Sequence, residues 1–257
     1  MKRTASLLLF LVLPGCGTEA SAPPARAGDP SARAEGEQAF LRGDYAEAAE
    51  RFSLAAEAGD AEAAVWQGRA LMKLENWSQA ERAFRASLRL PGEPGWQARL
   101  GQADALLVLG RPEEAAKALR TLADDPRALK TLEPALVLYK TAVAEMRCGN
   151  WEEAGTRLRE VSRTWPGTPW AVQADERRAD VLDRRFSVQL GVYAQSEAAD
   201  KRITELRSAG IAASSIPVRR GGADLFAVRG GTFATYREAV SETVRLKGLG
   251  EDGVVVP

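Results

Sequence analysis

The spacing of apolar residues divides the chain into two parts. Between Arg33 and Arg184, apolar residues recur every three or four positions, which is the period of an amphipathic helix. After Arg184 the period falls to two, and apolar residues alternate with small or polar ones in the segment FSVQLGVYAQ (Phe186–Gln195). That alternation indicates a half-buried strand. We therefore predict a helical domain followed by a separate domain built around a β-sheet.

The helical part contains an internal repeat. Four segments align, and each places a small residue three positions after its first apolar or aromatic residue and a large apolar residue four positions later. They are GDYAEAAERFSLA (Gly43–Ala55), ENWSQAERAFRAS (Glu75–Ser87), GRPEEAAKALRTL (Gly110–Leu122) and GNWEEAGTRLREV (Gly149–Val161). The small residue lets two helices approach closely, and the large one fills the space one turn further on. Another apolar-periodic helix precedes each segment, so the pattern predicts four helical hairpins.

This pattern resembles the tetratricopeptide repeat family over residues 34–184. The family's small-x11-small-x3-large signature occurs at Gly36/Ala48/Phe52, Gly68/Ala80/Phe84, Ala103/Ala115/Leu119 and Ala142/Ala154/Leu158. The interval before the last copy is longer than the others, so we expect a distorted junction around DDPRALKTLEP. The segment AVQADERRADVLDRR predicts a final helix whose charged outer face caps the stack.

Stacked hairpins form a superhelix whose concave groove holds peptides or partner helices. In the family, the first helix of each repeat lines that groove. The resemblance therefore assigns one apolar row to it, made of Phe40, Met72, Leu107 and Met146. The alternative is that these four side chains only pack between helices.

Residues 185–257 predict the order β-α-β-β-α-β. The strands are FSVQLGVY, AASSIPVR, LFAVRGGTF and GVVVP, and the helices are SEAADKRITELRSAG and TYREAVSETVRLKGLG. This order implies a four-stranded antiparallel sheet with both helices on one face and the other face open. The expected fold class is thus an α-helical solenoid followed by a small βαββαβ domain of the ferredoxin-like or RNP-like kind.

Two motifs of this domain resemble the SPOR (sporulation-related repeat) family, over the whole of residues 185–257. They are the first strand, Phe186–Tyr193, and the segment Val228–Phe233. The family binds peptidoglycan and prefers glycan strands stripped of their peptides, as found at the division septum. The resemblance therefore implies glycan binding on the open face of the sheet. The chain departs from the family pattern at Val192, Leu225 and Ala227.

Four residues are candidates for that site. Gln189 matches the family's glutamine, Tyr193 and Arg229 have suitable parity along their strands, and Arg219 lies nearby on the second strand. Stripped glycan offers hydroxyls, N-acetyl amides and apolar sugar faces, which require amide or guanidinium partners and flat rings. The lactate carboxylate of muramic acid favours an arginine. The alternative is that Gln189 only caps a polar sheet face.

The first residues resemble a bacterial lipoprotein signal. Lys2 and Arg3 precede an apolar run, Leu7–Leu13, that is too short to span a bilayer, and the run ends in Leu13-Pro14-Gly15-Cys16. We expect residues 1–15 to be a signal peptide, Cys16 to carry the lipid and residues 16–33 to form a disordered tether. An ordinary signal with a chance cysteine is the alternative. Gly17 favours the outer membrane, with the protein facing the periplasm.

Composition narrows the chemistry. The chain has no histidine, two cysteines, and 35 basic against 35 acidic residues. This composition removes His-based catalysis and His-metal sites, and the charge balance gives no electrostatic case for nucleic acid. We expect a non-catalytic envelope lipoprotein without cofactor or metal, acting in cell division or cell-wall organisation. It would bind peptidoglycan through the sheet and an envelope protein through the repeats. The alternative is a scaffold lipoprotein whose sheet docks protein rather than glycan.

Overall fold

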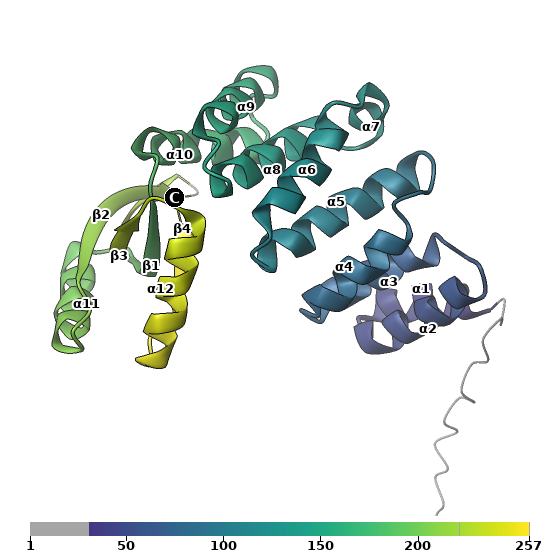
Figure 1. Ribbon diagram of the computed structural model, residues 1–257, viewed down its shortest axis with the longest axis horizontal. Coiled ribbons are helices and arrows are strands. Elements are labelled where there is room, and N and C mark those ends of the chain that lie inside the picture. Colours follow the sequence, from purple (N-terminus) through teal and green to yellow (C-terminus); the bar gives the residue numbers. More distant parts are fainter. Residues whose placement is uncertain (1–30, 221, 257) are drawn as a thin grey trace, which may run out of the picture.

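The computed structural model describes residues 31–220 and 222–256, apart from the side chains of residues 179 and 180. The predicted signal, the lipidation residue Cys16 and nearly all of the tether lie outside the described residues. The helical region comes first along the chain (Figure 1). Its helices are α1 (Ala32–Arg42), α2 (Tyr45–Glu57), α3 (Ala63–Lys73), α4 (Trp77–Ala86), α5 (Glu93–Val108), α6 (Pro112–Ala123), α7 (Pro126–Thr131), α8 (Pro134–Arg147), α9 (Trp151–Thr164) and α10 (Pro169–Asp183).

The hairpins form because small residues of one helix receive large residues of the next. A Cβ atom added to Gly36 would lie 2.9 Å from Cδ1 of Phe52. A Cβ atom at Gly68 or Gly101 would lie 2.7 or 2.5 Å from the ring of Phe84. Real Cβ contacts are longer than this, so α1, α3 and α5 need glycine where these rings pack. The expected α-solenoid of paired helices is confirmed.

The expected distortion before the last hairpin is a short extra helix, α7. Asp125 caps it by accepting a hydrogen bond from the backbone N–H of Arg127 at 2.9 Å, and Pro126 occupies its first turn. Ala128 is fully buried against the cores of α6 and α8. The longer spacing between the last two repeats therefore accommodates the short helix α7, which packs against its neighbours without interrupting the stack.

The second domain is a four-stranded antiparallel sheet with the order β2-β3-β1-β4. The strands are β1 (Phe186–Tyr193), β2 (Ala213–Arg220), β3 (Ala223–Phe233) and β4 (Val254–Val256), and the helices are α11 (Ser196–Ser208) and α12 (Tyr236–Gly248). Both helices pack on one face, where Leu206 and Leu246 meet Val188, Leu190 and Val228. The expected βαββαβ fold is confirmed.

Irregular register in β1 changes which side chains share a face. Its pairing with β3 shifts between Phe186 and Val188 and again between Gln189 and Gly191. An extra residue in a strand reverses the alternation beyond it. Val188, Leu190 and Tyr193 consequently pack toward α11 and α12, while Gln189 and Val192 lie on the opposite face.

That opposite face is turned toward the helical region and contacts it at one edge, so it is open only in part: Val192 and Val254, which lie on it, are 39% and 64% exposed. The Phe186 side chain is 1% exposed, and its ring centroid lies 5.0 Å from that of Trp151 on α9. The guanidinium carbon of Arg147 on α8 lies 5.3 Å from the ring centroid of Tyr236 on α12. Aromatic and cation–π contacts therefore join the two domains at one edge of the sheet.

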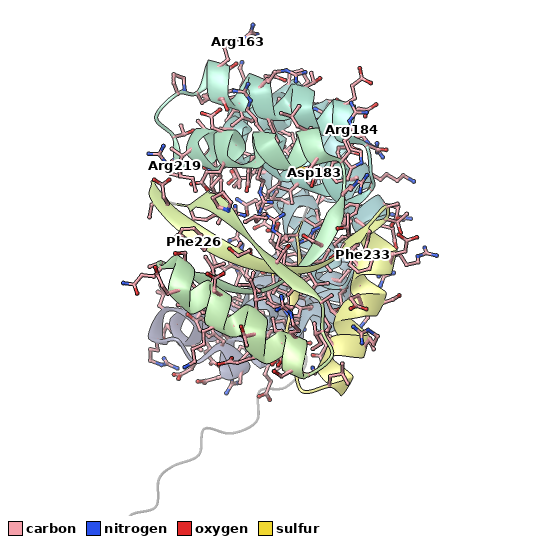
Figure 2. All side chains as sticks on the ribbon, turned by 90° about the vertical axis from the view of Figure 1, so that its left-hand side faces the viewer. Arg163, Asp183, Arg184, Arg219, Phe226 and Phe233 are labelled. Atoms are coloured by element: carbon pink, nitrogen blue, oxygen red, sulfur yellow. The ribbon has the colours of Figure 1, made fainter. Side chains whose placement is uncertain are left out.

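The short connection explains this packing. Helix α10 ends at Asp183 and β1 begins at Phe186, so the sheet starts within one turn of the last helix. Figure 2 shows Asp183 and Arg184 where the chain passes from the helices to the sheet, with Arg219 at the end of β2 next to the helices. Helix α10 packs on α8 and α9 and ends the helical stack as expected, while Asp175, Glu176 and Asp183 of α10 also face the strands β2 and β3 across a cavity.

Candidate functional site

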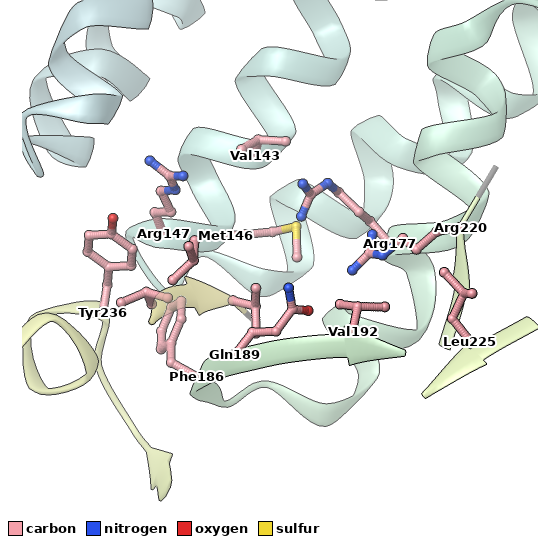
Figure 3. A pocket seen from close by; sticks show the side chains of 13 residues that line it. Val143, Met146, Arg147, Arg177, Phe186, Gln189, Val192, Arg220, Leu225 and Tyr236 are labelled. Atoms are coloured by element: carbon pink, nitrogen blue, oxygen red, sulfur yellow. The ribbon is translucent and has the colours of Figure 1, made fainter. Parts of the chain in front are cut away.

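A cavity of about 470 Å³ lies between α8, α10 and the sheet face that carries Gln189 (Figure 3). Both domains contribute to its wall, and the sheet supplies most of the apolar part. The lining residues are Val143, Met146, Arg147, Arg177, Phe186, Gln189, Val192, Arg220, Leu225, Tyr236, Val254, Val255 and Val256. Ligand pockets in proteins commonly have volumes of about 300–1,000 Å³ and combine an apolar lining with a few polar groups.

Gln189 is the candidate that the structure places at the centre of this wall. It lies on the inner strand β1, paired with Arg229 on β3 and with Val254 on β4. Its side chain is half-buried and points toward Met146 of α8 (Figure 3). An amide here offers two donors and one acceptor toward a ligand, on a backbone fixed by strands on both sides.

Tyr193 does not join Gln189, and the prediction that the two share a face is wrong. The register shift between Gln189 and Gly191 turns Tyr193 to the other side of the sheet. Its ring packs against the core beneath α11 and α12 and lies against Gly191, where an added Cβ atom would be 2.7 Å from the Tyr193 hydroxyl oxygen. Counting alternate residues from Gln189 fails because one extra residue intervenes.

On β2, Arg220 occupies the place that we assigned to Arg219. In the pairing with β3, Arg219 lies opposite Asp224 and Arg220 lies opposite Ala223. Because successive residues of a strand point to opposite faces, the side chains of the two arginines leave β2 on opposite sides of the sheet. The Arg219 side chain is 70% exposed, with Nε 4.0 Å from an oxygen of Asp224. Arg220 lines the cavity beside Val192.

Arg229 lines a second, adjacent cavity of about 660 Å³ between α10 and the strands β2 and β3. This cavity carries charges of both signs. Its charged lining residues are Asp175, Glu176, Asp183, Arg219, Arg220 and Arg229. Arg220 therefore lines both cavities. Arg229 is the direct pairing partner of Gln189 on β3, so the two residues lie on the same face of the sheet.

Sequence reasoning missed the two arginines that the helices contribute. Arg177 Nε donates a hydrogen bond to the Tyr139 hydroxyl at 2.7 Å, and Arg147 Nη1 donates one to the Leu107 carbonyl oxygen at 2.7 Å. Both arginines lie on helices of the repeat stack, Arg147 on α8 and Arg177 on α10. No local pattern marks them, because their role arises from the docking of the sheet.

The apolar row assigned to the partner groove packs against the helical cores. Phe40 and Met72 are partly buried against the first core, and Leu107 against the second. Met146 is buried in the third core and also lines the cavity with Gln189. Met146, one of the four residues assigned to the partner groove, thus belongs to the wall of the candidate glycan site.

Other reactive chemistry is limited among the residues that the structure describes. Burial raises the pKa of the Cys148 thiol to about 11, with nearby carboxylates adding to the effect. The thiol is therefore protonated at neutral pH and is a poor nucleophile. No cluster of three or more potential metal-ligating Cys, Asp or Glu side chains occurs within the described residues. None of the described helices has the length and hydropathy needed to cross a membrane.

Comparison with known proteins identifies both kinds of module. Residues 183–257 match the model of the SPOR domain, and residues 65–129 match a model of the tetratricopeptide repeat. A SPOR domain suggests peptidoglycan binding, and tetratricopeptide repeats suggest interaction with protein. No curated protein matches the chain. Among solved structures, the crystal structure of MamA protein aligns at 14% identity and a TM-score of 0.44, covering 69% of this chain and 92% of that one.

Proposed function

We propose that this protein binds stripped peptidoglycan glycan through the cavity that contains Gln189. The observation that supports this proposal most strongly is the position of Gln189. It projects from an inner strand into a cavity lined by both apolar and polar residues, and not into a packed core. Sugar rings match such a lining, since their faces pack on Val192 and Leu225 while their hydroxyl and amide groups meet Gln189. The match of residues 183–257 to the SPOR domain supports the same ligand class.

The repeats supply the second activity, which is recruitment of an envelope protein. Their concave side is the expected binding surface, as in stacked helical hairpins generally. We propose that the chain is a non-catalytic adaptor that brings this partner to glycan during cell division or cell-wall organisation. The match of residues 65–129 to the tetratricopeptide repeat supports a protein partner.

The proposed anchor is lipid on Cys16, with the protein facing the periplasm and held at the outer membrane. The motif Leu13-Pro14-Gly15-Cys16 supports it. Several acyl chains on one residue give stable attachment where one chain does not. Cell fractionation tests this part, since Cys16→Ser should move the protein from the membrane to the soluble fraction.

Sedimentation with purified sacculi tests the glycan activity. The full chain should pellet with sacculi stripped of peptides by an amidase, and it should pellet less with untreated sacculi. The physical reason is that the peptides crowd the muramic acid units that must enter the cavity. If the chain stays in the supernatant with both preparations, the sheet does not bind glycan and the protein-docking alternative takes its place.

A further inference from the structure

Among the side chains that the structure describes, those lining the cavity that holds Gln189 carry an excess of positive charge. Its lining includes Arg147 from α8, Arg177 from α10 and Arg220 from β2. No carboxylate contributes to the lining among the side chains that the structure describes. Three guanidinium groups from three separate elements thus border one cavity, which we call the arginine cavity.

Neutral groups hold two of these arginines in place. Arg177 is positioned by the Tyr139 hydroxyl, and Arg147 by the Leu107 carbonyl oxygen and the Tyr236 ring. These partners fix the side chains without neutralising their charge. A guanidinium has five N–H donors, so each arginine keeps donors for a further group. Figure 3 shows Arg177 and Arg220 reaching into the space above Val192, near the Gln189 amide.

The second cavity provides an internal comparison. There Arg219, Arg220 and Arg229 share the wall with Asp175, Glu176 and Asp183, so the described lining carries equal numbers of positive and negative side chains. The charge excess is therefore a property of the arginine cavity and not of the whole junction between the domains. A cavity lined by guanidinium groups favours an anion that fits their planar donors.

We propose that the arginine cavity binds a carboxylate of the sugar ligand, and that the helical repeats thereby form part of the glycan site. The ligand class is an acidic amino sugar such as muramic acid, whose lactate group supplies one carboxylate per disaccharide. This inference rests on the proposed function, since Gln189 must hold the same glycan. In this proposal Arg177 and Arg220 make acidic sugars bind more tightly than neutral ones, while Gln189 binds both kinds of sugar.

The test compares two forms of one ligand on the full chain. The probes are a soluble oligomer of alternating N-acetylglucosamine and N-acetylmuramic acid, and the same oligomer with its carboxyl groups reduced to alcohols. Titration calorimetry should give a dissociation constant at least about tenfold lower for the carboxylate form, as one charge-assisted pair contributes. Arg177→Gln and Arg220→Gln should each remove most of this preference.

The chain offers a matched control for each variant. Arg178→Gln changes the next residue of α10, which is exposed and paired with Asp175, and Arg219→Gln changes the exposed neighbour of Arg220. Both controls should keep the tenfold preference. If the Arg177→Gln variant unfolds because the hydrogen bond to Tyr139 is lost, the Arg220→Gln variant alone tests whether the arginines cause the preference for the carboxylate form.

The outcomes separate this inference from the proposed function. Equal affinity of the wild-type chain for both oligomers would overturn the carboxylate site and leave glycan binding intact. Preference retained in Arg177→Gln and Arg220→Gln would overturn the role of these arginines. Failure of the wild-type chain to bind either oligomer would overturn the proposed function together with the inference.

Discussion

Replacing Phe84 with alanine is expected to lower the free energy of unfolding by about 3–5 kcal/mol. The Phe84 side chain on α4 is 1% exposed, and its ring fills the space left by Gly68 on α3 and Gly101 on α5. Truncation leaves a cavity between three helices at once, and the two glycines have no side chains that could refill it. Urea denaturation followed by circular dichroism measures the change.

The control for this prediction is Leu41→Ala. Leu41 lies on α1 of the same helical region and is 86% exposed, so its truncation should change the free energy of unfolding by less than about 0.5 kcal/mol. Equal effects of Phe84→Ala and Leu41→Ala would mean that the ring does not hold the stack together, contrary to the packing described above.

Gln189→Ala should weaken binding of stripped glycan by about tenfold or more. Loss of one amide removes its hydrogen bonds to the sugar and leaves the ligand's own polar groups unpaired in a half-buried cavity, at a cost of about 1–3 kcal/mol. The fold should be unaffected, because the strand is held by its backbone pairs to Arg229 and Val254. Sedimentation with stripped sacculi at several protein concentrations measures the change.

Gln195→Ala provides the same chemical change outside the cavity. Gln195 is exposed just before α11, and its side chain makes no capping hydrogen bond. Its variant should sediment like the wild-type chain. A loss of binding in both variants would indicate a general effect on the domain, and no loss in either would remove Gln189 from the site.

Much of the fold follows from local patterns in the chain. The small–large pairs such as Gly36 with Phe52 predict the hairpins, because close helix approach leaves few residue types that fit. The change of period after Arg184 predicts the sheet, and the order of strands and helices predicts its topology. Each of these features depends on residues close in sequence or on a repeated spacing.

The arrangement of the site depends on features that local patterns do not contain. The displacement of Tyr193 comes from a register shift in β1, and alternation in a sequence does not reveal an extra residue in a strand. The roles of Arg147 and Arg177 come from the docking of the sheet on α8, α9 and α10. That docking rests on contacts such as Trp151 with Phe186, which belong to different domains.

The side-chain amide of Gln189 reports directly on whether the sugar enters the cavity. In the full chain labelled with ¹⁵N-glutamine, the Gln189 amide resonances should be assigned by their loss in Gln189→Ala and followed while stripped glycan oligomer is added. These resonances should shift and reach saturation with the ligand, while those of Gln195 stay in place. Unchanged Gln189 resonances at saturating glycan would contradict this expectation, because the sugar would then bind elsewhere on the molecule.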